Sequence, residues 1–273
     1  AERVYNVLDD QSHIDDFGKI DDIEVKGKVE FKNVDFAYDD ENFVLKDVSF
    51  EIKAGTTLAI VGSTGSGKTT IINLLGRYYN INGGEILVDG KNINKYKVQY
   101  LRERLALVLQ DVFLFDGSVF ENIKLRDQGI TDEEVIKAAK QIGAHEYIMN
   151  MPDQYKFHIT ERGNNLSMGQ RQLISFVRAL VVNPDILILD EATSSVDTET
   201  EATIQYAIEQ LIDKRSSIII AHRLSTIRHA DKILVMDQGV VAEIGTHNEL
   251  MKIKDGKYKA LYDLQFDGEP VSQ

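Results

Sequence analysis

A glycine-rich loop constrains the fold of this chain more than any other sequence feature. The segment from Gly62 to Thr69 reads Gly-Ser-Thr-Gly-Ser-Gly-Lys-Thr; it follows the short apolar run 57–61 and precedes a helical pattern that extends to about residue 75. Glycines at this spacing let consecutive backbone N–H groups face phosphate oxygens, and the helix that begins there adds its dipole. The sequence therefore predicts a buried strand, a phosphate-binding loop and a helix, in that order, within an α/β fold.

Each position of the loop has an expected role. The Lys68 amine is suited to the β- and γ-phosphates of a nucleotide, and the Thr69 hydroxyl is suited to hold Mg²⁺. A flexible glycine turn is the simpler interpretation, but the strand before the loop and the helix after it disfavour that interpretation. The residues predicted to bind nucleotide here are Gly62, Ser63, Thr64, Gly65, Ser66, Gly67, Lys68, Thr69 and Thr70.

Composition narrows the class of protein further. The 273 residues include 31 Lys and Arg against 44 Asp and Glu, for a net charge of −13, and no cysteine. The absence of cysteine excludes disulfides, Cys-ligated zinc and a thiol nucleophile. Strong net negative charge disfavours a general nucleic-acid coat and a basic membrane-surface helix. It does not exclude a nucleotide, because a few local donors act at close range.

Hydrophobic periodicity indicates the order of the elements. Alternating or short apolar runs predict strands at 29–34, 48–52, 57–61, 84–88, 106–109, 186–190 and 217–221, and a hairpin at 233–236 and 240–243. Helices are expected from the capping box Thr131/Glu134 to about residue 143, around 146–150, over 167–182, and after the capping box Thr198/Glu201. Strands that alternate with helices, together with a helical block near 115–182, favour an α/β core with a mostly helical insertion.

Two carboxylates end one of the buried strands. The run 186–189 is entirely apolar and leads directly into Asp190 and Glu191. Ligands of open α/β folds bind at the carboxyl edge of the sheet, where such side chains lie. Asp190 suits the Mg²⁺ site, and Glu191 could polarise a water for in-line attack on the γ-phosphate. A pair of solvated acidic residues is the simpler alternative, and the phosphate loop makes the functional interpretation the favoured one.

The segment 166–170, Leu-Ser-Met-Gly-Gln, opens the long helix. Ser167 and Gln170 have the spacing of a capping box, which is a purely structural role. A helix N-terminus with a Ser hydroxyl, and with Gly169 allowing close approach, is also a phosphate site. Position along the chain does not separate these two roles.

Taken together, these motifs resemble those of the ATP-binding-cassette (ABC) family over residues 29–260. The segment 166–170 is similar to the family signature, with Met168 where glycine is common. The resemblance implies that Tyr38 stacks on adenine, that Gln110 senses Mg²⁺ and the attacking water, and that His222 contacts the γ-phosphate. It likewise implies that residues 195–197 cross a dimer seam. The implied catalytic residues are Glu191, His222 and Gln110; the implied metal ligands are Thr69, Gln110 and Asp190; and Ser167, Gly169 and Gln170 would bind the nucleotide of a partner chain.

The resemblance also carries expectations about architecture and partners. It implies a phosphate-loop NTPase core with an N-terminal antiparallel β portion and an inserted helical subdomain near 115–182. The segment 160–163, Thr-Glu-Arg-Gly, and the helical start at residues 1–8 are similar to those of exporter-type members. Residues 1–27 would then be a linker helix and connector from a transmembrane domain, and residues 28–273 the nucleotide-binding domain. ATP and Mg²⁺ are the implied cofactors. A second nucleotide-binding domain and a transmembrane domain are the implied partners, at the cytoplasmic face of a membrane and without nucleic acid.

Three other functions fit the sequence less well. A cassette ATPase acting in DNA repair or translation is disfavoured, because the segment between Lys68 and Ser167 is too short for a very long coiled coil and only one cassette is present. Glu191 and His222 argue against a non-catalytic nucleotide switch. A small-molecule kinase is the weakest alternative, since nothing resembles an acceptor lid.

Overall fold

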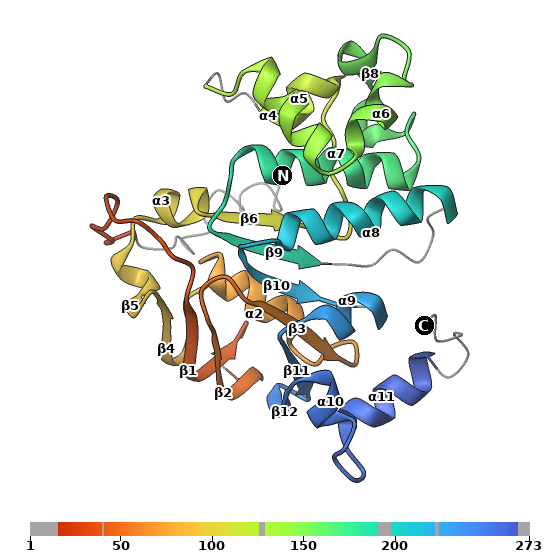
Figure 1. The fold of residues 1–273 in the computed structure, drawn as a ribbon. Helices are drawn as coiled ribbons and strands as arrows, with labels where there is room; N and C mark the ends of the chain where they lie inside the picture. The colour runs from red at the N-terminus through yellow and green to blue at the C-terminus, as the bar shows by residue number, and fades with distance from the viewer. Residues whose placement is uncertain (1–15, 40, 126–128, 191–197, 222–223, 267–273) are drawn as a thin grey trace, which may run out of the picture.

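The core of the molecule is a six-stranded sheet with the strand order β12-β11-β3-β10-β9-β6 (Figure 1). The computed structural model describes residues 16–39, 41–125, 129–190, 198–221 and 224–266. Neighbouring strands of the sheet are parallel except for β12, which pairs antiparallel with β11. The strands are β3 (Thr57–Gly62), β6 (Leu105–Val108), β9 (Ile186–Asp190), β10 (Ser216–Ile220), β11 (Lys232–Asp237) and β12 (Val240–Gly245).

A second, antiparallel sheet has the order β2-β1-β4-β5. Its strands are β1 (Val29–Ala37), β2 (Phe43–Ile52), β4 (Gly83–Val88) and β5 (Lys91–Asn92). The β1–β2 hairpin is longer than the sequence predicted, because its pairing continues to Ala37 opposite Phe43. The register of this pairing shifts between Phe31 and Val34, and it shifts again on either side of Phe36. Such bulges interrupt the period-two pattern, so the outer half of the hairpin is not visible as a simple alternation.

Helix α2 (Lys68–Leu75) and helix α3 (Val98–Glu103) contribute buried side chains to a hydrophobic cluster that contains residues of both sheets. The central strands divide their side chains between two hydrophobic clusters. Leu58 and Ile60 pack with α2 and the antiparallel sheet, whereas Ala59 and Val61 pack with the helices on the other face. A sheet buried on both faces needs continuous apolar strands, which is the pattern in the sequence.

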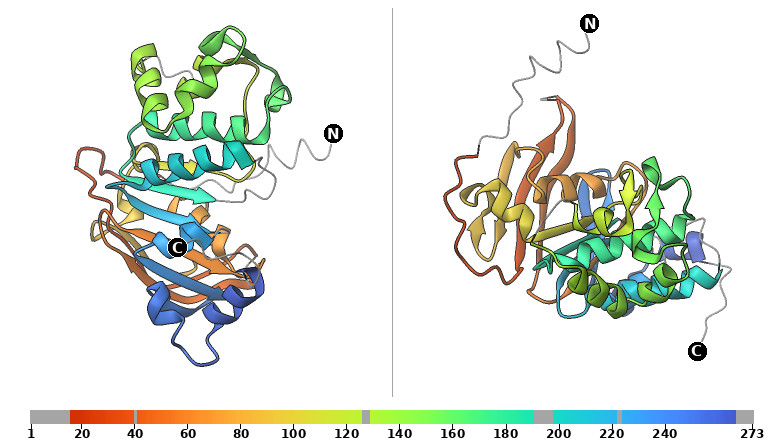
Figure 2. Two further views of the ribbon diagram at one scale, coloured as in Figure 1. Left: turned by 45° about the vertical axis from the view of Figure 1, so that its right-hand side comes forward. Right: turned by 90° about the horizontal axis from the view of Figure 1, so that it is seen from above.

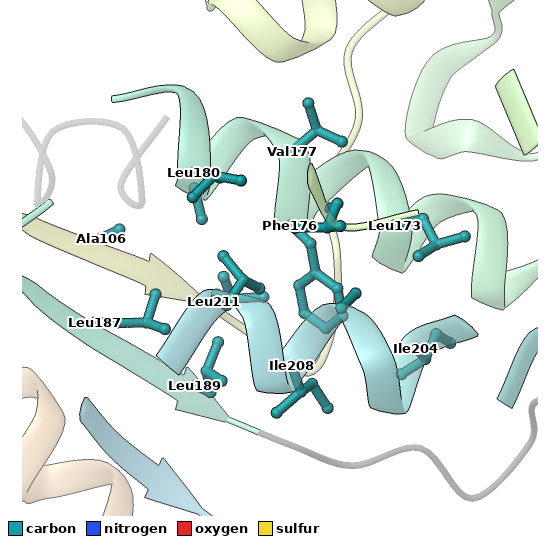
Figure 3. Packing of buried hydrophobic residues seen from close by; sticks show 14 of the residues in the cluster. Ala106, Leu173, Phe176, Val177, Leu180, Leu187, Leu189, Ile204, Ile208 and Leu211 are labelled. Atoms are coloured by element: carbon teal, nitrogen blue, oxygen red, sulfur yellow. The ribbon is translucent and has the colours of Figure 1, made fainter. Parts of the chain in front are cut away.

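Helices cover the second face of the sheet and extend from it as a block (Figures 1 and 2). The block contains α4 (Val119–Lys124), α5 (Asp132–Gln141), α6 (Ala144–Met149), α7 (Met168–Val181) and the short pair β7 (Gly117–Ser118) and β8 (His158–Ile159). Figure 3 shows α7 packed on α8 (Thr198–Ile212), with Phe176 of α7 beside Ile208 and Leu211 of α8. The predicted capping boxes at Thr131 and Ser167 are confirmed.

Of the three remaining α-helices of the described residues, the first lies beside the central sheet (Figure 1) and the last two lie at the opposite end from that block (Figure 2). They are α9 (Leu224–His229), α10 (His247–Leu250) and α11 (Lys257–Phe266). The N-terminal backbone of α11 is tied to β12, since the Glu243 carboxylate accepts hydrogen bonds from the backbone N–H groups of Lys257 and Tyr258. Across the described ranges, we find no helix with the length and apolarity needed to cross a bilayer.

Residues 16–27, which were expected to form a connector, lie against the segment that leads into α3. The N–H groups of Lys19 and Ile20 donate to the Lys95 carbonyl at 2.9 and 3.0 Å, and the Lys97 N–H donates to the Ile20 carbonyl at 3.0 Å. The Asp16 carboxylate accepts from the Val98 N–H at 3.1 Å. These bonds join residues far apart in sequence, so local patterns do not predict them. The expected helix at residues 1–8 lies outside the described residues.

Candidate nucleotide-binding site

The phosphate loop joins the carboxyl end of β3 to the first turn of α2. Gly67 occupies the N-cap position in the left-handed region, with φ of 103°, and no side chain caps the helix. Gly62 approaches another strand closely, because a Cβ there would lie 2.3 Å from the Met236 carbonyl oxygen. Both positions therefore require glycine. An uncapped helix start leaves backbone N–H groups for an anion, with the favourable end of the helix dipole behind them.

Lys68 folds back over this loop. Its Nζ donates to the carbonyl oxygens of Gly62 and Ser63 at 2.8 and 2.9 Å. Burial lowers the pKa of Lys68, while the negative charge of Asp190 acts to raise it. The Ser66 hydroxyl is buried and has no hydrogen-bond partner among the described residues. A buried hydroxyl without a partner is costly unless a ligand completes it. The donors of the loop therefore fit a polyphosphate.

Asp190 lies at the same edge of the sheet as this loop. In the parallel register, Ile220 of β10 lies opposite both Asp190 of β9 and Ile60 of β3. The carboxyl ends of the three strands therefore meet at one edge, which is where α/β folds bind ligands. Thr69 is exposed on the first turn of α2 at this edge. Glu191 and His222 follow two of these strands in sequence but lie outside the described residues, as do residues 195–197.

An aromatic cluster adjoins the phosphate loop. Tyr38 follows β1 and is 52% exposed. Its hydroxyl lies 3.2 Å from the Thr70 hydroxyl of α2 and accepts a hydrogen bond from Asn73 Nδ2 at 3.4 Å. Its ring meets those of Phe36 and Tyr79 edge-on, with centroids 4.8 and 5.0 Å apart. Tyr79 was not identified from the sequence; the adjacent tyrosines after α2 were the only available signal.

Gln110 lies beside Met168 of the segment 166–170. Gln110 follows β6 and lines a cavity of about 160 Å³ together with Met168, Arg162 and other residues. Ser167 is exposed and caps α7: its hydroxyl accepts from the Gln170 N–H at 3.2 Å, and its own N–H donates to Gln170 Oε1 at 2.9 Å. The structural role considered for this pair is therefore present.

The loop between β6 and β7 lies at the surface. Between β6 and β7 the chain exposes the large hydrophobic residues Leu109, Phe113 and Phe115. Two polar side chains from the helical block, the buried Asn122 and the partly buried Arg178, bond to the backbone of this loop. Asn122 of α4 accepts from the Phe115 N–H at 2.8 Å and donates to its carbonyl at 2.9 Å. Arg178 of α7 donates to the Phe113 carbonyl at 3.1 Å, and burial lowers the pKa of Arg178 to about 10.

The fold and the loop define a phosphate-loop NTPase with an added antiparallel sheet and a helical insertion, which is the architecture of ABC ATPases. The family model described as ABC transporter matches residues 45–194, more than half of the chain. The chain belongs to the ABC transporter family, and it is the ATPase part of such a protein.

Individual relatives agree with this assignment. The chain is 46% identical over 267 residues to the uncharacterized ABC transporter ATP-binding protein YknV of Bacillus subtilis, covering 97% of this chain and 44% of that protein. It is also 46% identical over 265 residues to the probable multidrug resistance ABC transporter ATP-binding/permease protein YheH of the same organism, covering 97% of this chain and 39% of that protein. A bacterial Atm1-family ABC exporter with ATP bound is similar in structure, with a TM-score of 0.88 and 38% identity over 100% of this chain and 47% of that one. The chain thus spans less than half the length of these proteins.

Proposed function

We propose that this chain is the nucleotide-binding domain of an ABC exporter, which it powers by binding and hydrolysing ATP. The observation that carries the proposal is the geometry of the phosphate loop: an uncapped α2, a partly buried lysine amine and a buried Ser66 hydroxyl without a partner, at the edge where Asp190 ends its strand. The relatives whose names include a permease favour an exporter over a cassette ATPase of DNA repair or translation. By the same comparison, the transporter would move its substrate in the direction of export.

The residues divide the chemistry among them. Lys68, Ser66 and the backbone of residues 62–70 bind the phosphates, with Tyr38 under the base. Thr69, Asp190 and Gln110 would hold Mg²⁺, which when bound neutralises charge on the phosphate oxygens. Glu191 takes a proton from the attacking water, and His222 stabilises the γ-phosphate. Two such domains would face each other head to tail, so that Ser167, Gly169 and Gln170 complete the site of the partner chain.

The exposed loop between β6 and β7 supports a membrane domain as the other partner. Leu109, Phe113 and Phe115 are each about half exposed, and Phe113 and Phe115 contact each other edge-on with centroids 5.0 Å apart. Clustered exposed apolar side chains are typical of an interaction surface. In this arrangement residues 1–27 are the linker and connector, residues 28–273 the cassette, and residues near 115–182 its helical subdomain, at the cytoplasmic face of the membrane.

The proposal is tested by measuring the oligomeric state of a Glu191→Gln variant with and without Mg-ATP. This change removes the general base but keeps the phosphate site, so ATP should bind and not turn over. Loss of a positioned general base costs about 10²–10⁴-fold in rate. We expect a monomer without nucleotide and a dimer with Mg-ATP by light scattering. More than a tenth of wild-type activity would show that Glu191 is not the base.

A further inference from the structure

The exposed Tyr38 ring is held in place from several sides, although it lies at the surface. Phe36 and Tyr79 meet it at interplanar angles of 84° and 88°. Perpendicular contacts of this kind stabilise a ring without lying flat against it. Neither neighbour is stacked parallel to Tyr38, and about half of the Tyr38 surface remains exposed. The cluster therefore restrains a ring that is still accessible from solvent.

The hydroxyl end of Tyr38 is tied to the phosphate-loop helix. Thr70 and Asn73, which contact the hydroxyl, lie on the first and second turns of α2. Tyr79 comes from the segment that follows the same helix, after a turn in which the Tyr78 N–H donates to the Asn73 carbonyl at 2.9 Å. One rigid helix thus carries the phosphate loop at its start and the supports of Tyr38 along and beyond its length.

From this arrangement we infer that Tyr79 and Asn73 are positioning residues for nucleotide binding, acting through Tyr38. They set the distance between the base platform and the phosphate loop, and they lower the entropy cost of ordering an exposed tyrosine when a base stacks on it. The inference rests on the proposed function, since it requires Tyr38 to contact the base. It assigns a role to Tyr79 that depends on contact with Tyr38 and not on contact with nucleotide.

The test compares two adjacent tyrosines. Tyr78 and Tyr79 are both 45% exposed, but Tyr78 packs under the Arg102 guanidinium, 4.7 Å from the ring centroid, instead of against Tyr38. Titration calorimetry on the whole chain would measure the affinity for a non-hydrolysable ATP analogue and for inorganic tripolyphosphate, both with Mg²⁺. Tyr79→Ala should weaken the analogue by about threefold to tenfold, the scale of one aromatic pair, and leave tripolyphosphate unchanged. Tyr78→Ala should change neither, and Tyr79→Phe should restore analogue affinity.

Asn73→Leu gives a second, independent variant, because it keeps the branched shape of the side chain but removes the donor to Tyr38. We expect analogue affinity to fall about twofold to fivefold, the scale of one neutral hydrogen bond, again with tripolyphosphate unchanged. Equal weakening of both ligands by Tyr79→Ala would mean general damage to α2 and would overturn the inference, as would unchanged affinity for both. If Tyr38→Ala leaves the analogue unaffected, the base platform itself is wrong. If wild type does not bind tripolyphosphate, the phosphate-loop proposal fails instead.

Discussion

At the scale of single residues, Lys68 shows how the site is prepared for its ligand. Its amine donates hydrogen bonds to two carbonyl oxygens of its own loop, those of Gly62 and Ser63. The amine is partly buried, and burial lowers its pKa, so its charge is held at a cost that phosphate oxygens would relieve. The same contacts hold the amine over the loop that is proposed to bind the phosphates.

Lys68→Ala should weaken ATP binding itself. A hydrogen bond that involves a charged group contributes about 1.5–3 kcal/mol, so the dissociation constant should rise by about ten- to a hundredfold. Titration calorimetry with Mg-ATP measures this directly, and Lys53→Ala, at an exposed lysine away from the loop, is the control. Unchanged affinity in the Lys68 variant would contradict the assignment of the phosphate loop.

Tyr38 should act mainly through its ring. Tyr38→Ala should cost about 1–2 kcal/mol of ATP binding, the scale of aromatic contact and burial. Tyr38→Phe should weaken ATP binding less, by about twofold to fivefold as for Asn73→Leu, because it keeps the ring contacts and loses only the hydroxyl bonds to Thr70 and Asn73. GTP should also support hydrolysis, since a stacking surface contacts the face of a base and not its edge. Selectivity for ATP above about a hundredfold over GTP would point to hydrogen bonds to adenine and against a stacking platform.

At the scale of elements, helix starts are set locally and the loops between them are not. Four helices, α4, α5, α7 and α10, begin at a serine or threonine that forms a full capping box with a Glu or Gln three residues later. Such boxes need only residues within one turn, so the sequence shows them directly. The loop that exposes Phe113 and Phe115 depends instead on Asn122 and Arg178, which reach it from two different helices.

Asn122→Ala should destabilise the domain by about 2–3 kcal/mol, because it leaves buried backbone groups without partners. Asn122 is 1% exposed and bonds to both backbone groups of Phe115 and to the Ser118 carbonyl. The free energy of unfolding in urea measures the effect. Asn150→Ala, at an exposed asparagine of the same helical block, should stay within about 0.5 kcal/mol of wild type. Equal stability of the two variants would show that Asn122 does not hold the loop.

At the scale of the whole molecule, charge governs association. Each chain carries −13, so two bare domains repel each other unless ligand bridges them. In the proposed head-to-tail dimer, the bridge is the nucleotide, bound to Lys68 of one chain and contacted by Ser167 of the other. Linkage then requires ATP to tighten the dimer by the same factor as the dimer tightens ATP.

Ser167→Arg should block ATP-driven dimerisation and hydrolysis while leaving ATP binding to the monomer unchanged. Since Ser167 also caps α7, Ser167→Asp is the matched variant: it keeps a good N-cap and adds a negative charge facing the phosphates. Both should stay monomeric with Mg-ATP and fold normally. Mixing Ser167→Arg with Lys68→Ala leaves one intact composite site per mixed dimer, so some ATPase activity should return. Normal dimerisation of Ser167→Arg alone would reduce Ser167 to a helix cap.

The sequence by itself determined the features that depend on neighbours along the chain. The phosphate loop, Gly62 to Thr69, is recognisable because its glycines, lysine and threonine lie within one strand–loop–helix unit. The buried strand ending at Asp190 and the capping boxes at Thr131 and Ser167 follow for the same reason. The resemblance to ABC proteins placed these parts in order, and the family comparisons agree with it.

Only the tertiary structure decided which distant residues meet. The bulged outer half of the β1–β2 hairpin, the bond from Val98 to Asp16 and the contact of Tyr38 with Tyr79 all join segments that no local pattern connects. The side-by-side position of Gln110 and Met168 depends likewise on how the helical block packs against β6. These contacts form because the apolar faces of the strands and helices must be buried against one another. Which strand or helix packs against which is therefore decided by the shape of the whole core, and this information is not present in any one segment of the sequence.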